Sequence, residues 1–432
     1  MKLTLKNIAA IKSADIELDH ITIIAGYNSS GKSTISKALY GMVSPYNNIH
    51  LKINFEKEKS LNFLLREHED LSHECRNIIF EIINNIKGTN INFPKSISPG
   101  QFVLALPHVL KQFKEEYLYF YEKDDIELFK NELLSKKENL CKLINMVLQK
   151  DDSEYISRVI QLTLSNIFNK QIVTLNNPDV SQSFLTLEIS ADETLSIIIN
   201  EDSTIKIKEK IAYLKNNILY LDTKHIIDEL NNNNRRIRNT SNPYGNNLLN
   251  LLRAEPENDT ELSVEEQTEY DNFLSTFYSI FNETLHGELT IEGDIFYFKD
   301  YEKDALIDMK NVASGMKCLL AIQRLIQNRT INKNTILIID EPETSLHPEW
   351  QVFFADILVL LNKHLGIKLL INSHSPYFIR AIEIKMANNN MANNGRYYLM
   401  EPSASLFVAK DVTKSTEEIY KCLYKPLESL TL

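Results

Sequence analysis

Two spacings of apolar side chains occur along the chain, and they predict two kinds of secondary structure. Short apolar runs typical of strands lie near both ends, at residues 3–8, 14–18, 21–25, 217–221, 335–339, 368–371, 397–400 and 405–412. Between about residues 50 and 215 the spacing becomes helical, as in the runs Leu61, Leu64, Leu65 and Leu133, Leu134, Leu140, Leu143, Ile144, Val147. The pattern predicts an α/β fold in which a mainly helical segment interrupts a strand-rich domain.

The order of these segments predicts a domain organisation. We expect a first lobe at residues 1–44, a mainly helical insertion at 45–215 and a second lobe at 216–432. Within the insertion, two apolar runs around residues 190–193 predict a hairpin. Strands at 289–291, 295–298 and 306–309 are expected to lead into a helix, and another helix is expected at 416–427. The insertion lacks a sustained heptad register and a central C-x-x-C hook, which argues against a long coiled coil.

The first strand-to-helix connection carries a phosphate-binding pattern. Residues 26–33 read G-Y-N-S-S-G-K-S, between the apolar run 21–25 and a helix-prone stretch at 32–41. Glycines at both ends allow backbone N–H groups to point at phosphate oxygens, and the helix start presents its positive end to the same anion. Lys32 is expected to reach the β and γ phosphates of ATP, and Ser33 to bind Mg²⁺. The flanking strand and helix disfavour the alternative of a chance Gly/Ser turn. The residues expected to bind ATP here are Gly26, Tyr27, Asn28, Ser29, Ser30, Gly31, Lys32, Ser33 and Thr34.

Two later strand ends carry polar residues suited to phosphate chemistry. The run 335–339 ends in Asp340 and Glu341, and the run 368–371 is followed by His374. We expect Asp340 to hold Mg²⁺ and Glu341 to polarise the attacking water. His374 is a candidate γ-phosphate sensor, because imidazole can hydrogen-bond a transferring phosphoryl group. The phosphate loop disfavours the alternative of a solvated acidic pair. A lone histidine is more often structural, but His374 follows the acidic pair by the length of one helix, at 348–363, and a return strand.

A further helix start lies between the phosphate loop and the acidic pair. Residues 313–317 read A-S-G-M-K and precede the periodic apolar residues 319–326. Ser314 is expected to be the N-cap, and Gly315 leaves the helix start open. Together they predict a second anion-binding helix terminus.

Together the four motifs resemble the ABC-type ATPase head of transporters, SMC proteins and RecF-like proteins. The resemblance implies a P-loop NTPase with a mixed central sheet and an antiparallel N-terminal subsheet. It also implies a composite ATP site, in which the Ser-Gly signature of one subunit caps the γ-phosphate held by the other, and therefore a homodimer or higher homo-oligomer. Position by position, it assigns the loop asparagine, signature, carboxylate pair and switch histidine to Asn28, Ser314, Gly315, Asp340, Glu341 and His374. The signature departs from the L-S-G-G-Q of transporters.

The sequence motif that contains the acidic pair's glutamate narrows the resemblance to particular families. Residues 341–348 read E-P-E-T-S-L-H-P, which looks like RecF and, more closely, the overcoming-lysogenization-defect (OLD) class and its standalone AAA family relatives in phage defence. OLD nucleases carry a Toprim domain after the switch histidine, but residues 375–432 contain no D-x-D pair. The resemblance therefore implies an ATPase sensor and scaffold, similar to those of Septu or PARIS, that controls a separate nuclease or toxin effector.

Composition bears on location and partners. The chain has a net charge of −11, four scattered cysteines, no apolar stretch of membrane-spanning length and no signal-peptide pattern, so we expect a cytoplasmic protein without a membrane partner. The acidic charge argues against a broad nucleic-acid surface, although nucleic-acid binding in a local basic groove remains an alternative. The densest basic cluster is Arg235, Arg236 and Arg238.

Two alternative functions and one unassigned residue remain open. A RecF-like repair or replication ATPase would bind DNA directly, and a transporter nucleotide-binding domain would copurify with a membrane subunit. A Mg²⁺-sensing glutamine is expected in this class, and Gln101 is a candidate without a committed role.

Overall fold

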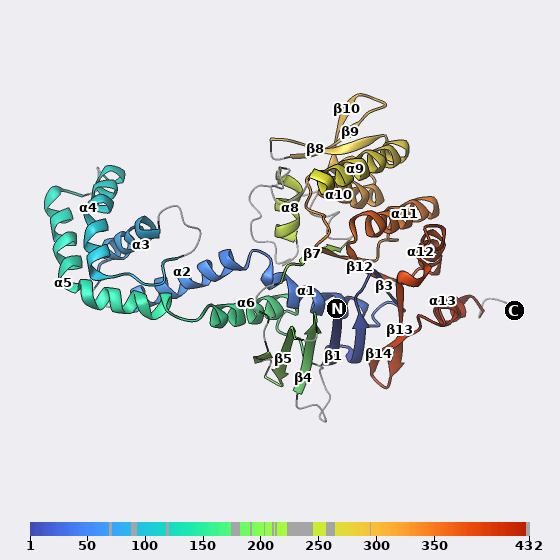
Figure 1. Ribbon diagram of the computed structural model, residues 1–432, viewed down its shortest axis with the longest axis horizontal. Coiled ribbons are helices and arrows are strands. Elements are labelled where there is room, and N and C mark those ends of the chain that lie inside the picture. The colour runs from blue at the N-terminus through green and yellow to red at the C-terminus, as the bar shows by residue number, and fades with distance from the viewer. Residues whose placement is uncertain are drawn as a thin grey trace. The chain divides into compact units, whose positions relative to one another are not determined.

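The computed structural model describes most of the chain (Figure 1). The described residues are 1–68, 71–87, 93–117, 121–173, 182–190, 192–202, 204–209, 211, 214–222, 245–255, 264–293 and 295–428. They form two units, one of Met1–Asn47 with Thr163–Leu432 and the other of Asn48–Leu162. The basic cluster at residues 235–238 lies outside the described residues.

The first unit is built on one mixed sheet. Among the described residues the sheet has eleven strands, in the order β6 (Ile205–Glu209), β5 (Thr194–Asn200), β4 (Gln182–Glu188), β1 (Lys2–Ile8), β2 (Ile11–Glu17), β14 (Leu406–Asp411), β13 (Gly395–Ser403), β3 (Ile21–Ala25), β12 (Lys368–Ser373), β11 (Thr335–Asp340) and β7 (Asn217–Asp222). The part from β13 through β3, β12 and β11 to β7 is parallel. Every residue of β3 and β11 is buried, as continuous apolar runs in parallel sheets require. The strands predicted at 21–25 and 335–339 are thus confirmed.

Strand register places three sequence motifs at one edge of this sheet. Ala25 of β3 pairs with Ser373 of β12, and Asn372 of β12 pairs with Asp340 of β11. Because parallel strands end on the same side, the chain segments after β3, β11 and β12 leave the sheet together. These segments contain the phosphate loop, the acidic pair and His374.

The antiparallel part of the sheet includes strands that were expected in the helical insertion. Leu5 of β1 pairs with Leu185 of β4, and β4 continues into β5 and β6. Alternate residues of β4 are buried, among them Leu185 and Leu187, and helix α1 contacts this strand. The hairpin therefore belongs to the first unit, and the second unit ends at Leu162. The insertion expected at 45–215 is shorter in the structure, because residues with period-2 spacing extend the sheet of the head.

Helices and a smaller sheet complete the first unit. The helices are α1 (Lys32–Val43), α8 (Gly245–Arg253), α9 (Val264–Leu285), α10 (Ser314–Gln327), α11 (Pro348–Leu365), α12 (Pro376–Asn388) and α13 (Glu417–Glu428). The smaller sheet is β8 (Gly287–Glu292), β9 (Ile295–Asp300) and β10 (Ala305–Asp308). Strand β8 packs on α9 and α10, as Figure 1 shows. Phe277, Phe281 and Leu319 lie in the resulting core.

The second unit is helical. It contains α2 (Ile49–Glu67), α3 (His73–Lys87), α4 (Pro99–Glu116), α5 (Lys123–Leu148) and most of α6 (Asp152–Ile167), whose last turn belongs to the first unit. Helix α4 packs on α3 and α5, and α5 packs on α2. Gln101 lies in this unit, where it forms a capping box with Ser98 at the start of α4. The structure thus gives Gln101 a role in capping the start of a helix.

The fold class predicted from the sequence is confirmed. The sheet is mixed, its antiparallel part includes the N-terminal strands, and the insertion is helical. Within the first unit, the two ends of the insertion lie close together. A Cβ atom on Gly41, near the end of α1, would lie 2.5 Å from Cδ2 of Leu164, near the end of α6.

Candidate ATP-binding site

The phosphate loop connects β3 to α1 in a conformation that favours glycine. Gly31 has a φ of +89°, and a Cβ atom there would lie 2.4 Å from Cδ1 of Ile11. An alanine at this position would therefore be strained and would clash with the side chain of Ile11 at the start of β2. The loop side chains of Tyr27, Asn28 and Ser29 are exposed, whereas Ser30 is buried. The central residues of the loop thus face solvent, while Ser30 is packed inside the domain.

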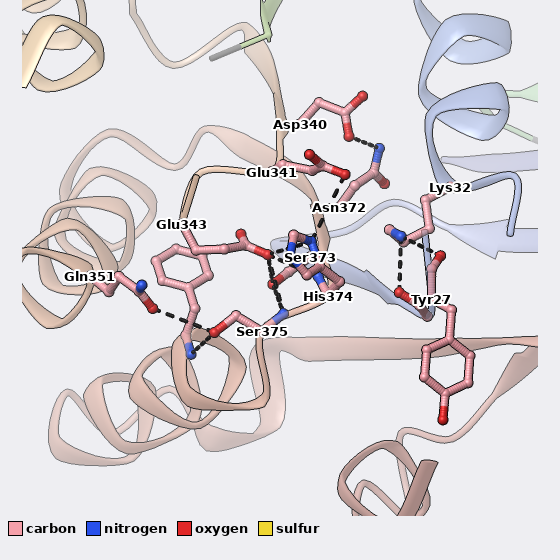
Figure 2. Close-up of polar contacts among 12 residues, drawn as sticks. Tyr27, Lys32, Asp340, Glu341, Glu343, Gln351, Asn372, Ser373, His374 and Ser375 are labelled. Atoms are coloured by element: carbon pink, nitrogen blue, oxygen red, sulfur yellow. Dashed lines mark hydrogen bonds and ion pairs between the residues drawn. The ribbon is translucent and has the colours of Figure 1, made fainter. Parts of the chain in front are cut away.

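Lys32 folds back over this loop. Its Nζ donates hydrogen bonds to the carbonyl oxygens of Gly26 at 2.9 Å and Tyr27 at 2.8 Å, as Figure 2 shows for Lys32 and Tyr27. The side chain is 4% exposed, and burial lowers the pKa of the ammonium group, while the charges of Glu341, Asp340 and Glu343 act in the opposite direction. The buried hydroxyl of Ser30 has no hydrogen-bond partner among the described residues. The Lys32 ammonium group and the unmatched Ser30 hydroxyl are donors of the kind that bind the oxygens of a triphosphate.

Asp340 is held by two side chains that the sequence interpretation did not identify. The hydroxyl of Tyr220 in β7 donates to Oδ2 at 2.9 Å, and Nδ2 of Asn372 donates to Oδ1 at 3.1 Å. Nδ2 of Asn372 also lies 2.8 Å from Oγ of Ser36 in α1. These contacts connect three neighbouring strand ends and the helix after the loop. The signal available in the sequence was that Asn372 precedes His374 at a strand end.

Glu341 begins a turn directly after β11. Its N–H donates to the carbonyl oxygen of Asn372 at 3.0 Å, which continues the strand pairing by one residue. Its φ is +50°, a left-handed conformation that is uncommon for a residue with a side chain and that often marks functional sites. Oε1 of Glu341 lies 3.9 Å from Nδ1 of His374, so the predicted water-activating carboxylate and switch histidine lie in one cluster (Figure 2).

Glu343 is a further carboxylate of this cluster that the sequence interpretation left without a role. It is 6% exposed and points at the segment 373–375 (Figure 2). Its Oε1 accepts a hydrogen bond from the hydroxyl of Ser373 at 2.9 Å. It was missed because only the tertiary structure brings position 343 against this segment.

The signature residues lie elsewhere in the chain. Helix α10 begins at Ser314, with Ala313 as the N-cap and no side-chain cap hydrogen bond. The expectation that Ser314 is the N-cap is therefore wrong by one position, which leaves its hydroxyl uncommitted to capping. A Cβ atom on Gly315 would lie 2.7 Å from the carbonyl oxygen of Ser345, so the helix start packs closely on the segment that follows Glu343.

Within one chain, the phosphate loop, Asp340, Glu341 and His374 lie at one edge of the large sheet, whereas the signature begins a helix that packs mainly on β8, α8 and α9. Helix α10 lies beside β8 and α9, apart from α1 in Figure 1. Its first turn contacts the loop after β11.

The donors present fit Mg²⁺ only with help from a phosphate ligand. No group of three or more His, Cys, Asp and Glu side chains suited to a metal ion occurs within the described part of the chain. Mg²⁺ is commonly bound through one or two side-chain oxygens, waters and substrate phosphates. Ser33 at the start of α1 and Asp340 at the end of β11 are side chains of the required type, and they remain the proposed ligands.

A strand, a G-x-x-x-x-G-K-S loop and a helix, beside a strand that ends in two carboxylates, define a P-loop ATPase of α/β fold. Residues 1–379 match the family model described as AAA ATPase domain, and the chain belongs to this family. No curated protein matches the sequence. Across the described residues, none of the helices combines the length and the apolar character that a membrane span requires.

Three solved structures of SMC heads are similar to the chain. The SMC head domain from Thermotoga maritima has 11% identity, covers 95% of this chain and 98% of its own, and gives a TM-score of 0.38. The SMC head bound to the C-winged helix domain of ScpA has 10% identity, coverages of 96% and 98%, and a TM-score of 0.44. The SMC head with an extended coiled coil bound to the C-terminal domain of ScpA, from Pyrococcus furiosus, has 11% identity, coverages of 100% and 99%, and a TM-score of 0.40.

Proposed function

We propose that this ATPase binds ATP with Mg²⁺ and hydrolyses it in a site that closes between two copies of the chain. The assembled heads would act as a sensor and scaffold for a separate nuclease or toxin effector in anti-phage defence. One observation carries the dimer proposal: the phosphate loop, acidic pair and switch histidine meet at one sheet edge, while the signature begins a helix that packs mainly on β8, α8 and α9. A second copy can supply the missing helix start.

The roles of the side chains follow from their chemistry. The loop N–H groups and Lys32 bind the phosphates, and Lys32 exchanges its two carbonyl contacts for phosphate oxygens. Glu341 accepts a proton from the attacking water, and His374 contacts the phosphoryl group being transferred. Ser33 and Asp340 would hold Mg²⁺, which neutralises phosphate charge when bound. Ser314 and Gly315 of the second copy would cap the γ-phosphate.

The proposed control of a separate effector is supported by the E-P-E-T-S-L-H-P motif and by the acidic character of the chain. A net charge of −11 disfavours broad contact with nucleic acid, whose recognition is dominated by phosphate neutralisation. The RecF-like alternative predicts salt-sensitive binding of DNA by the purified protein alone. The defence role predicts that the chain copurifies with a nuclease or toxin encoded beside it.

The Glu341→Gln variant tests hydrolysis and dimer closure together. Only the proton acceptor changes, so ATP should bind normally, turnover should fall by about 100-fold or more, and the dimer should accumulate with ATP. Light scattering after gel filtration, with and without ATP, measures the assembly. Glu349→Gln is the matched control, because Glu349 is exposed at the start of α11. Wild-type turnover in Glu341→Gln would reassign the base, and a monomer with bound ATP would exclude the composite site.

A further inference from the structure

The Glu343 carboxylate gathers three donors of the segment that carries His374. Its Oε1 accepts hydrogen bonds from the Ser373 hydroxyl at 2.9 Å and from the N–H groups of His374 at 2.9 Å and Ser375 at 3.2 Å (Figure 2). Charge-assisted hydrogen bonds of this kind are stronger than neutral ones, and Glu343 is buried. The backbone of residues 373–375 is therefore fixed relative to the turn after β11.

Two polar atoms of the same cluster are unmatched. Oε2 of Glu343 and Nδ1 of His374 are buried atoms without a hydrogen bond among the described residues. Nδ1 lies 3.1 Å from Oε1 of Glu343, close enough for an ion pair. A buried polar group without a hydrogen bond destabilises the folded state, and a native structure rarely retains two such groups side by side without a reason. Rotation of the imidazole ring toward the carboxylate would satisfy both.

The distances identify Glu343, and not Glu341, as the partner of the ring. Nδ1 of His374 is 3.1 Å from Glu343 and 3.9 Å from Glu341. Glu343 is also the more buried carboxylate, with a side chain 4% exposed against 21% for Glu341. Glu343 is thus the carboxylate that the protein engages most closely, and Glu341 is the more exposed of the two.

We propose that Glu343 is the positioning residue for His374. It fixes the backbone of residues 373–375 and accepts a hydrogen bond from Nδ1–H, so that Nε2 is the ring nitrogen presented to the phosphate. This inference rests on the proposed function for the role of the phosphate, but the Glu343–His374 pairing itself requires no turnover. The hydrogen bond made by one imidazole nitrogen determines what the other can do.

Nitrogen NMR of the full-length protein tests the pairing without ATP hydrolysis. The imidazole ¹⁵N signals of His374, assigned with His374→Ala, should shift in Glu343→Gln, because the carboxamide changes the partner of Nδ1 while keeping an oxygen for the three donors. They should not shift in Glu349→Gln. Signals that are the same in Glu343→Gln and wild type would overturn the proposal, even if ATP hydrolysis is confirmed. Shifted signals in a protein that does not hydrolyse ATP would support the pairing and remove only the proposed function.

Kinetics test the consequence of the pairing. Glu343→Gln should lower kcat roughly tenfold while KM for ATP stays within about twofold, because positioning acts on the transition state. Adding Glu343→Gln to His374→Ala should cause no further loss, since the two residues act as one unit. Losses that multiply in the double variant would show that Glu343 acts independently of His374. Glu343→Ala also removes the oxygen that accepts the three hydrogen bonds from residues 373–375, so it should lower kcat further than Glu343→Gln.

Discussion

Asn372 donates a hydrogen bond to Asp340 across two neighbouring parallel strands, with 3.1 Å between Nδ2 and Oδ1. The same amide nitrogen contacts Ser36 in α1, and Tyr220 donates to the other oxygen of Asp340. The proposed Mg²⁺ ligand is thus oriented by two strands and by the helix that follows the phosphate loop. Outer-shell contacts of this type orient a metal ligand and tune its affinity.

Removal of the amide should weaken the metal dependence of turnover. In Asn372→Ala, Asp340 loses one of the bonds that orient it, so we expect the Mg²⁺ concentration for half-maximal ATPase activity to rise about 10-fold or more. The loss of a fully buried amide should also lower the free energy of unfolding by about 1–3 kcal/mol. Titration with Mg²⁺ and urea unfolding measure the two effects. Asn393→Ala, at an exposed position, is the control, and an unchanged Mg²⁺ requirement would contradict the role assigned to Asn372.

Lys32→Ala should abolish tight nucleotide binding with little effect on folding. Loss of charge-assisted bonds to phosphate costs about 2–4 kcal/mol, or roughly 30- to 1000-fold in the Kd for ATP. The free energy of unfolding should change little in Lys32→Ala, because burial disfavours the charged ammonium group in the folded protein, as its lowered pKa indicates. Calorimetric titration with ATP and thermal unfolding provide the measurements. Lys37→Ala on the same helix should bind normally, and wild-type affinity in Lys32→Ala would be incompatible with the site.

Ser314→Arg should spare nucleotide binding but prevent the dimer from closing, because a long cation would occupy the helix start that caps the partner's phosphate. Each preparation of Ser314→Arg or Lys32→Ala alone should be nearly inactive. A mixture should recover activity, because each mixed dimer has one intact loop facing one intact signature. ATPase assays of the two proteins alone and mixed make the measurement. Full activity of Ser314→Arg by itself would show that the signature does not act in trans.

Lys52 in α2 should make the stability of the protein depend on pH. Burial lowers the pKa of Lys52 to about 8, whereas an unfolded lysine has a pKa of about 10.4. Between these values the unfolded chain binds a proton that the folded chain releases, so this group raises stability as pH rises through the interval. Lys52→Met should be more stable than wild type by about 1–3 kcal/mol at pH 7, and the difference should narrow toward pH 9.5. Urea unfolding at both pH values checks this, with the exposed Lys142→Met as control. A stability difference between Lys52→Met and wild type that does not change with pH would contradict the lowered pKa of Lys52.

The sequence could predict those parts of the site that depend on local order. The strand, loop and helix around Lys32 and the buried run that ends in Asp340 are continuous in sequence, so their pattern predicts their placement. Tyr220, Asn372 and Glu343 could not be assigned in this way, because their contacts depend on strand order and on the path of the turn after β11. The proposed catalytic roles stay predictions.

The error in the extent of the insertion has a physical cause. Strands β4 to β6 follow helices in the chain, yet their apolar faces are buried only when they extend β1. Sequence order alone does not reveal such pairing between distant segments. The one-residue error at Ser314 reflects a helix whose start is set by packing of Gly315 on residues 345 and 346, and not by a side-chain cap.

The close approach of Gly41 and Leu164 means that the polypeptide departs from the ATPase domain and rejoins it at adjoining points. Residues 48–162 are therefore an insertion whose two chain connections to the ATPase domain lie at neighbouring points of that domain. An insertion joined in this way can change in length or sequence without altering the strand order that brings Lys32, Asp340 and His374 together, because segments whose ends lie close are tolerated at a domain surface.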